Sequence, residues 1–456
     1  MKCRLIKRNS IKRTGPGTTD LTAGRPARQI IRFALPLVFG TLFQQLYSFA
    51  DTVIVGRCLG VDALAAVGAT YSLNFLTLGF VQGACVGFGI PLSERFGAKD
   101  REGLRRYLWN GVWLCAAISL VLSVAMTLSA LPLMRLIHTP ASILEMSVIY
   151  IRIIFIGIPA SILYNYSASV LRAMGDSTHP FYFLLVSCLL NIVLDYVLIV
   201  PFGMGVGGAA WATVLSQLVS GVLNTWWYVA HVEQRRPAAG ELALSVPHLK
   251  RLCIVGFPMG FEYSVSAVGA VVMQNAINSL GSVAVAAQTA GEKIRQIFTL
   301  PMESVGMAMA TYTGQNNGAG RTDRIRGGIR SGLWIQGVCC AAAWVLLFVL
   351  KRALVYLVLG DAAVQVTAGA VEYLTRISPL FFLHGALMIF RNVLQGLGYS
   401  TYAVISGVGE LAGRSLGGWI AVHGFGYAAI CYSNPLAWGF ALCYCAGMVW
   451  AVMRKR

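Results

Sequence analysis

The stretch LPLVFGTLFQQLYSFADTVIVGRCLGVDALAAVG, residues 35–68, decides the fold class, because it is long and apolar enough to cross a bilayer and yet carries a carboxylate at depth. That carboxylate is Asp51, and an ionisable side chain at membrane depth costs about 3 kcal/mol or more. Gly40, Gln44, Tyr47 and Asp51 follow one another at steps of three or four residues, so they share one face of a helix. We expect this face to line a site on an ion or substrate path.

The composition places the whole chain in a membrane. Of its 456 residues, 57% are hydrophobic and only 12% are charged, and the mean hydropathy is +0.67. A soluble protein of this size carries far more charge. The net charge of +18 comes from basic tails and alternate short loops, without the aromatic-interleaved stripe of a nucleic-acid site. We therefore expect a lipid bilayer around the protein and no nucleic-acid partner.

The cysteines and the N-terminal tail point to no further chemistry. Most of the eleven cysteines lie inside apolar runs, with no C-x-x-C pair and no histidine spacing typical of a metal site. We expect no cofactor. Residues 1–28 are basic and lack an apolar core of their own, which favours a flexible cytoplasmic tail over a signal peptide.

Helix-length apolar runs can be counted along the chain, and their length excludes barrel strands. They predict twelve transmembrane helices, at about 29–56, 66–92, 107–133, 145–171, 180–202, 206–231, 251–279, 284–313, 329–358, 366–394, 400–421 and 427–453. The loops after the second, sixth and eighth helices hold most of the loop Lys and Arg residues, as does the C-terminal end. The positive-inside rule then predicts both termini in the cytoplasm of a multi-pass protein of the cell membrane.

The chain also repeats itself. LGVDALAA at residues 59–66 returns as LGSVAVAA at 280–287, Gly97-Ala98 returns as Gly318-Ala319, and Pro36 answers to Pro258. Such a duplication predicts two pseudo-symmetric six-helix lobes around a central cavity, related by an axis along the membrane normal. We assign residues 29–232 to the N-lobe, 233–250 to a cytoplasmic linker and 251–456 to the C-lobe.

A second carboxylate, Asp195, lies in the predicted fifth helix with Asn191 one turn before it. Counting residues from the outer helix ends puts Asp51, Asp195 and Thr213 of the sixth helix at a common depth of about 9–10 Å. Two carboxylates in one low-dielectric pocket cannot both ionise cheaply, so the pair should hold a proton or a cation. We predict an H⁺ or Na⁺ site at Asp51, Asn191, Asp195 and Thr213, with Tyr47 beside it.

The residues of the predicted cation site also have purely structural interpretations. In them Thr213 bonds only its own helix, Asn191 only joins two helices, and Asp195 is solvated from the surface. In the second half, pairing the prolines brings Met273 opposite Asp51, so the acid pair is not copied there. We interpret Glu410 and Arg414, four residues apart, as a structural ion pair, and expect Arg152 to neutralise a partner inside the N-lobe. The role of Glu262 stays open.

The assembled residues resemble the multidrug and toxic compound extrusion (MATE) family over all but the tail. The resemblance is carried by Pro36, Gln45, Tyr47, Asp51, Leu171-Arg172-Ala173-Met174-Gly175-Asp176, Asn191 to Asp195, Gly207 to Thr213 and Gln315 to Ala319. It implies a monomeric antiporter that exports cationic or amphipathic organic compounds by alternating access. Gln44, Asn165, Gln274 and Glu262 are our candidates for the substrate cavity.

The resemblance also assigns roles within the N-lobe. In the DinF-like branch the cation or proton site falls on Asp51, Asn191, Asp195 and Thr213, with Tyr47 as a partner, and Pro36 is where the first helix bends. The NorM-like branch instead needs a glutamate eight residues after the second proline, where this chain has Ser266. We therefore expect coupling in the N-lobe.

Two other functions are open to such a chain. A flippase of a lipid-linked oligosaccharide or peptidoglycan precursor would need cationic side chains to hold pyrophosphate, whereas the chain offers Asp51 and Asp195. A membrane-embedded transferase would need clustered carboxylates for Mg²⁺, and no D-x-x-x-D or D-D-x-x-D occurs. We therefore do not expect an enzyme.

Overall fold

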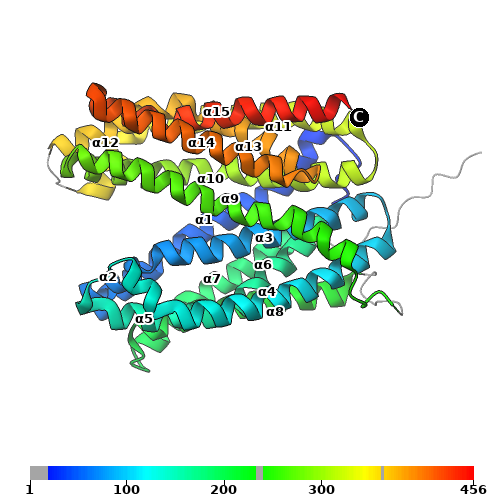
Figure 1. The fold of residues 1–456 in the computed structure, drawn as a ribbon, viewed down its shortest axis with the longest axis horizontal. Coiled ribbons are helices and arrows are strands. Elements are labelled where there is room, and N and C mark those ends of the chain that lie inside the picture. Colours follow the sequence, from blue (N-terminus) through cyan, green and yellow to red (C-terminus); the bar gives the residue numbers. More distant parts are fainter. Residues whose placement is uncertain (1–18, 233–239, 361–363, 456) are drawn as a thin grey trace, which may run out of the picture.

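A computed structural model of the chain describes residues 19–232, 240–360 and 364–455. These residues are helical throughout, with no strand among them, and they form two bundles side by side (Figure 1). The expected tail and linker lie partly outside the described residues, at 1–18 and 233–239. The start of the first helix and the end of the last lie at the same end of the molecule, which we call the basic end for the arginines of its loops (Figure 1).

The helices of the first half follow the expected order. They are α1 (Pro26–Leu59), α2 (Val61–Ala69), α3 (Tyr71–Gly97), α4 (Arg101–Leu136), α5 (Ala141–Ile156), α6 (Ile158–Ala173), α7 (Thr178–Ile199) and α8 (Gly205–His231). The second half comprises α9 (Val246–Ser279), α10 (Ser282–Gly318), α11 (Thr322–Leu359), α12 (Val364–Ile377), the short η1 (Ser378–Leu380), α13 (Phe381–Gly396), α14 (Ser400–Ile420), the π-turn η2 (Ala421–Phe425) and α15 (Gly426–Arg454). In the described part of the chain these elements make the twelve expected rods.

Three of the expected helices are interrupted, and the one expected at 66–92 is divided at Thr70 between α2 and α3. The rod expected at 145–171 bends by 45° between α5 and α6, where Gly157 precedes Pro159. Proline lacks an N–H and its ring clashes with the carbonyl four residues earlier, so the helix restarts at this point. The rod expected at 366–394 is likewise interrupted at η1, which contains Pro379.

Length and apolarity alone qualify eight stretches of the described chain as membrane spans, or nine if the bent α5–α6 pair is one span. One of these stretches, Ser400–Arg454, holds both α14 and α15. Helix α10 does not qualify, and it carries Glu292, Arg295 and Glu303 inside the membrane-length rod. A rod this polar must turn much of its surface toward protein or water.

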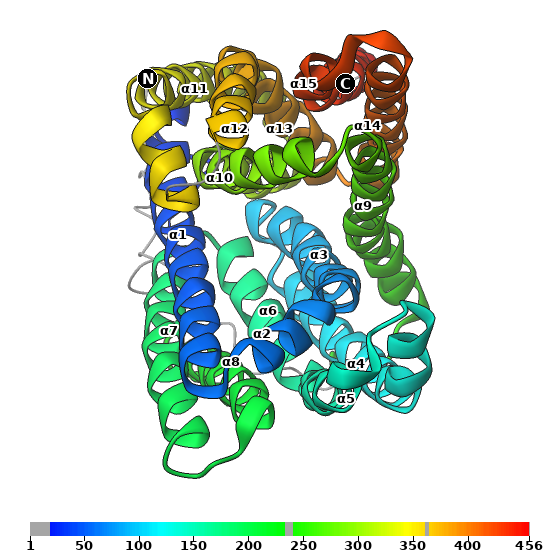
Figure 2. The same ribbon diagram turned by 90° about the vertical axis from the view of Figure 1, so that its left-hand side faces the viewer.

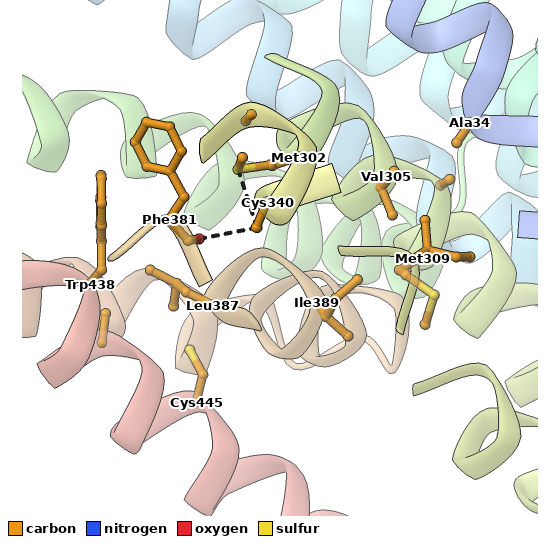
Figure 3. Packing of buried hydrophobic residues seen from close by; sticks show 14 of the residues in the cluster. Ala34, Met302, Val305, Met309, Cys340, Phe381, Leu387, Ile389, Trp438 and Cys445 are labelled. Carbon is orange, nitrogen blue, oxygen red and sulfur yellow. Dashed lines mark hydrogen bonds between the residues drawn. The ribbon is translucent and has the colours of Figure 1, made fainter. Parts of the chain in front are cut away.

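Helices α1 and α9 cross between the bundles in opposite directions (Figures 1 and 2). The first half of α1 packs against α10 and α11, and Ile30, Phe33 and Ala34 belong to the core of the second bundle. Figure 3 shows Ala34 beside Val305 and Met309 of that core. Reciprocally, α9 packs against α3 and α4, and Leu252 belongs to the core of the first bundle. The expected lobe boundaries stay a prediction, but each core includes part of the other half.

Small residues permit the crossing of α9 over α3. Gly83 and Gly87 of α3 lie against the backbone of Met259 and Gly256, and Gly260 lies against Phe80. Glycines four residues apart on both helices let two backbones approach closely, as in membrane helix pairs of the G-x-x-x-G type. The two bundles are therefore in backbone contact along this seam.

A cavity of about 400 Å³ lies between the bundles. Residues of α1, α3, α6 and α10 line it, namely Phe33, Leu37, Val86, Gly89, Ile90, Ser169, Arg172, Ala173, Met307, Ala310 and Thr311. We call it the interbundle cavity.

Candidate functional site

The second half of α1 carries Asp51 into the first bundle, where α1 packs against α7. Gly40 lies in this contact, and a Cβ atom there would be 3.3 Å from Cδ2 of Leu184 on α7. Asp195 and Asn191 lie one turn apart on α7, and both side chains are buried, with 0% and 1% of their surface exposed. The carboxyl groups of Asp51 and Asp195 lie within hydrogen-bonding reach of each other. The structure thus brings together the two acids that the count of residues from the helix ends placed in one layer.

The pair lacks hydrogen-bond donors. Both oxygens of Asp195, Oδ1 of Asp51 and both polar atoms of Asn191 are buried without a hydrogen-bond partner. Ionised carboxylates only accept hydrogen bonds, so two adjacent ones repel and satisfy nothing. A proton shared between the two acids would supply the missing donor.

A small hard cation would fit the same atoms. Carboxylate and amide oxygens are the ligands that such ions prefer, and Asp51, Asp195 and Asn191 offer them together. Among the described residues no group of three or more His, Cys, Asp or Glu residues is placed to hold a metal ion, so a transition-metal centre is not what this arrangement offers.

An open hollow of about 290 Å³ lies one helical turn from each acid, lined by Gln44 and Tyr47 of α1. Asn191 lines this cavity and stands one turn from Asp195. Its other lining residues are Tyr164, Leu184, Ser187, Cys188, Ser216 and Gln217. Gln44 hydrogen-bonds Tyr47, which lies near Asp51, so the face predicted from residues 40–51 does line a polar hollow.

One residue of the site was not anticipated. Tyr150 of α5 is buried and lies close to both Asp51 and Asp195. The signal in the sequence was a single phenol in the apolar run from Ser147 to Phe155, and nothing in that run shows which way it points. A phenol beside the acids can donate a hydrogen bond to whichever carboxylate is ionised.

The remaining predicted residues lie apart from the acids. The Thr213 hydroxyl donates to the Ala209 carbonyl 3.2 Å away on its own helix and makes no hydrogen bond to either acid. Asn165 donates to the Ser161 carbonyl at 2.8 Å, and Gln274 donates to Asn278 at 2.8 Å. Intrahelical bonding, the blander interpretation, is therefore what the structure gives for Thr213.

Glu262 belongs to a buried ionic network in the second bundle. Its oxygens accept from Arg391 at 3.1 Å and from Gln395 at 2.8 Å, so the charge of this candidate for the substrate cavity already has partners within the protein. Glu410 pairs with Arg414 at 3.1 Å as expected, and also with Arg391, which sequence reasoning missed. Buried charges need such partners, so this network is structural.

Pro36 and Arg152 are the last two residues for which the sequence predicted a role. Helix α1 continues through Pro36, which lies just before the point where the helix passes from one bundle to the other. Arg152 was expected to neutralise a buried partner, and this is wrong. Its side chain is exposed, on the same face of α5 as the exposed Ile149 and Ile156, and it makes no ion pair with a described residue.

Twelve membrane-length rods, two crossed bundles with a cavity between them and a buried acid pair define a membrane transport protein. Comparison with known proteins identifies the family. The MatE family model matches residues 36–197 and 258–411, and the chain belongs to this family. The two matched stretches begin at Pro36 and Pro258, the residues that the internal repeat pairs.

Individual relatives agree with the family assignment. The chain is 28% identical over 83% of its length to the probable multidrug resistance protein YpnP of Bacillus subtilis, covering 84% of that protein. It is also 28% identical to YoeA of the same organism, over 78% of each chain. A MATE family transporter solved in an outward-facing conformation shares the fold, with a TM-score of 0.90 at 21% identity over 98% of this chain and 100% of that one. The relatives of the present chain are transporters, so the chain is not an enzyme.

Proposed function

We propose that this protein is a multidrug efflux transporter that exports cationic and amphipathic organic compounds in exchange for H⁺ or Na⁺. The observation that carries the proposal is the close approach of Asp51 and Asp195, which leaves three buried carboxylate oxygens without a hydrogen-bond partner in the described part of the chain. Such a pair gains most from binding one positive charge. Relatives named as multidrug resistance proteins support the substrate class.

The path of α1 suggests how the ion is coupled to transport. Its first half is part of the second bundle's core, whereas Asp51 on its second half meets Asp195 in the first bundle. A change of charge at Asp51 therefore acts on a helix that is anchored in both bundles, with Pro36 between the two anchored segments. Antiport requires only that ion and substrate favour different arrangements of this one element.

The membrane setting follows from the charges at the two ends. The basic end carries Arg95, Lys99 and Arg101 after α3 and Arg321, Arg324 and Arg326 after α10. We assign this end to the cytoplasm by the positive-inside rule. The protein would act as a monomer, because each chain holds both bundles and the cavity between them.

The proposal is tested by ethidium efflux from energised cells expressing Asp51→Asn or Asp195→Asn. Each variant should lose most transport, because an amide cannot bind and release a proton. Asp62→Asn is the matched control, since Asp62 is exposed on α2 and should tolerate the change. Wild-type efflux by both site variants would refute the proposal. Imposed proton or sodium gradients in proteoliposomes then identify the coupling ion.

A flippase for a lipid-linked pyrophosphate remains the second candidate. The observation that favours it is Arg172, a cationic side chain lining the interbundle cavity. Movement of a fluorescent lipid-linked precursor by reconstituted protein, without ethidium transport, would replace the export proposal.

A further inference from the structure

The carboxylates of the second bundle differ in how they are neutralised. Glu262 and Glu410 both pair with Arg391, Glu292 pairs with Arg295, and Glu372 pairs with Arg376 at 2.8 Å. Glu303 of α10 is the exception on the described helices α9 to α15, because it pairs with no arginine or lysine. Its Oε1 lies 3.9 Å from Nε2 of His384, and it also hydrogen-bonds the Thr299 side chain and interacts with the charge of Arg295 without forming an ion pair with it.

Glu303 lies deep in the membrane span and is nevertheless exposed. It is about 32 Å from the first residue of α10 and about 22 Å from the last, at 1.5 Å per residue. The exposed fraction of its side chain is 48%. A charged carboxylate at this depth is tolerated when it faces water or a ligand rather than acyl chains.

The spacing of residues along α10 shows which space the side chain of Glu303 faces. Met307 and Ala310 follow it by four and seven residues, so all three share one helical face. Met307 and Ala310 line the interbundle cavity. The next residue, Ser304, shares its face with Thr311, which also lines the cavity, and its hydroxyl lies 3.2 Å from the Thr41 hydroxyl of α1. Glu303 therefore faces the space between the bundles, one helical turn from the cavity.

His384 of α13 stands behind this carboxylate. Only 6% of its surface is exposed, and neither ring nitrogen has a hydrogen-bond partner. Trp438 holds the ring in place, with centroids 4.9 Å apart. The 3.9 Å gap to Glu303 is too long for a direct hydrogen bond, so a donor group of a ligand can reach both the carboxylate and the imidazole.

We propose that Glu303, backed by His384, binds the positively charged group of the exported organic cation. This deepens the proposed function and rests on it. Among the acids of the described helices α9 to α15, Glu303 is the one that faces this space without an arginine or lysine ion pair, which makes it the acid that receives the ligand's charge. The substrate cation and the coupling ion then occupy different bundles, and they compete through the conformation rather than for one carboxylate.

The test measures ligand binding by the purified full-length protein in lipid nanodiscs without an ion gradient. Ethidium is the cationic probe and Nile red is the uncharged one. Glu303→Gln should weaken ethidium binding by about tenfold to a hundredfold, the range for losing one charge-assisted contact. Nile red binding should stay within about twofold, because it makes no charge pair. Glu372→Gln is the matched control, since Glu372 is already paired with Arg376 and should leave both affinities unchanged.

The decisive quantity is the ratio of the two affinities. An unchanged ratio in E303Q, with ethidium bound by the wild type, overturns this assignment and leaves the efflux proposal standing. A wild type that neither binds nor transports ethidium overturns both. If E303Q does not fold, E303D and His384→Phe provide the test. E303D should leave the ratio of ethidium affinity to Nile red affinity unchanged, and H384F should lower that ratio. The reverse pattern overturns the proposal.

Discussion

Gly97 at the end of α3 and Gly318 at the end of α10 each lie against the backbone of the other helix. A Cβ atom on Gly97 would overlap the carbonyl of Gln315, and one on Gly318 would overlap the carbonyl of Glu94. The two glycines hold equivalent places in the internal repeat, so one close contact joins the two halves symmetrically. The bundles therefore touch at the basic end of the molecule as well as along the α3–α9 seam.

The segment before α1 completes this contact. The side chain of Gln315 accepts from the backbone N–H of Leu21 at 3.1 Å and donates to the carbonyl of Ala173 at 2.9 Å. The backbone N–H of Thr19 donates to the carbonyl of Gly175 at 3.0 Å. Residues 19–21 therefore tie α10 of the second bundle to the turn after α6 of the first. Any movement that separates the two bundles at the basic end must break these bonds.

The first prediction concerns the glycine contact. Gly97→Ala and Gly318→Ala should each force the helix ends apart and destabilise this closed arrangement by about 1–3 kcal/mol, as overpacking does. The thermal midpoint of the purified protein should fall and ethidium efflux should decrease. Gly337→Ala is the control, because a Cβ there meets no atom within 4 Å and alanine favours a helix. Equal midpoints for all three variants would show that the contact is not tight.

The acid pair could be predicted from the sequence because membrane depth is a one-dimensional quantity. Counting residues from the helix ends placed Asp51 and Asp195 in one layer, and burial forces such groups to meet. Gln44 and Tyr47 followed from helical spacing alone. Thr213 shares the depth but not the direction, because its hydroxyl bonds Ala209. Depth fixes a layer and leaves the rotation of each helix undetermined.

Contacts between distant helices could not be read in the same way. Spacing within one helix gave Glu410 with Arg414, but Arg391 joins them from another helix, and only the packing of α9, α13 and α14 brings it there. The apolar run from 145 to 171 likewise conceals the break at Gly157, since Pro159 is compatible with a kink or a restart. Tyr150 was missed because, like Arg391, it meets its partners on other helices.

The second prediction concerns Arg391. Arg391→Met should leave Glu262 and Glu410 without their shared partner and destabilise the protein by about 3–5 kcal/mol, the range for a broken buried pair. Adding Glu262→Gln and Glu410→Gln should restore much of the thermal midpoint, because the stranded charges are removed. Arg376→Met serves as the control, since its pair with Glu372 is partly exposed and worth about 0.5 kcal/mol. A single variant as stable as the wild type would contradict the network's structural role.

The third prediction concerns Pro36. The proline removes one backbone hydrogen bond from α1 between the segment packed in the second bundle and the segment carrying Asp51. Pro36→Ala restores the N–H and should stiffen α1 at this point. We therefore expect a thermal midpoint equal to or above that of the wild type, together with a large loss of ethidium efflux. Pro132→Ala is the matched control, because Pro132 is exposed near the end of α4 and should change efflux little.

The combination of the two measurements separates a hinge from a packing role. If Pro36 served only to fit α1 between the bundles, replacing it would lower stability and efflux together. If α1 must bend when the charge at Asp51 changes, efflux falls while stability is kept, because the restored hydrogen bond favours one shape of the helix over the other. Full efflux by Pro36→Ala would mean that a change of charge at Asp51 does not act through a bend of α1 at this residue. The contact of α7, which carries Asp195, with α8 would then be the alternative link between ion binding and transport.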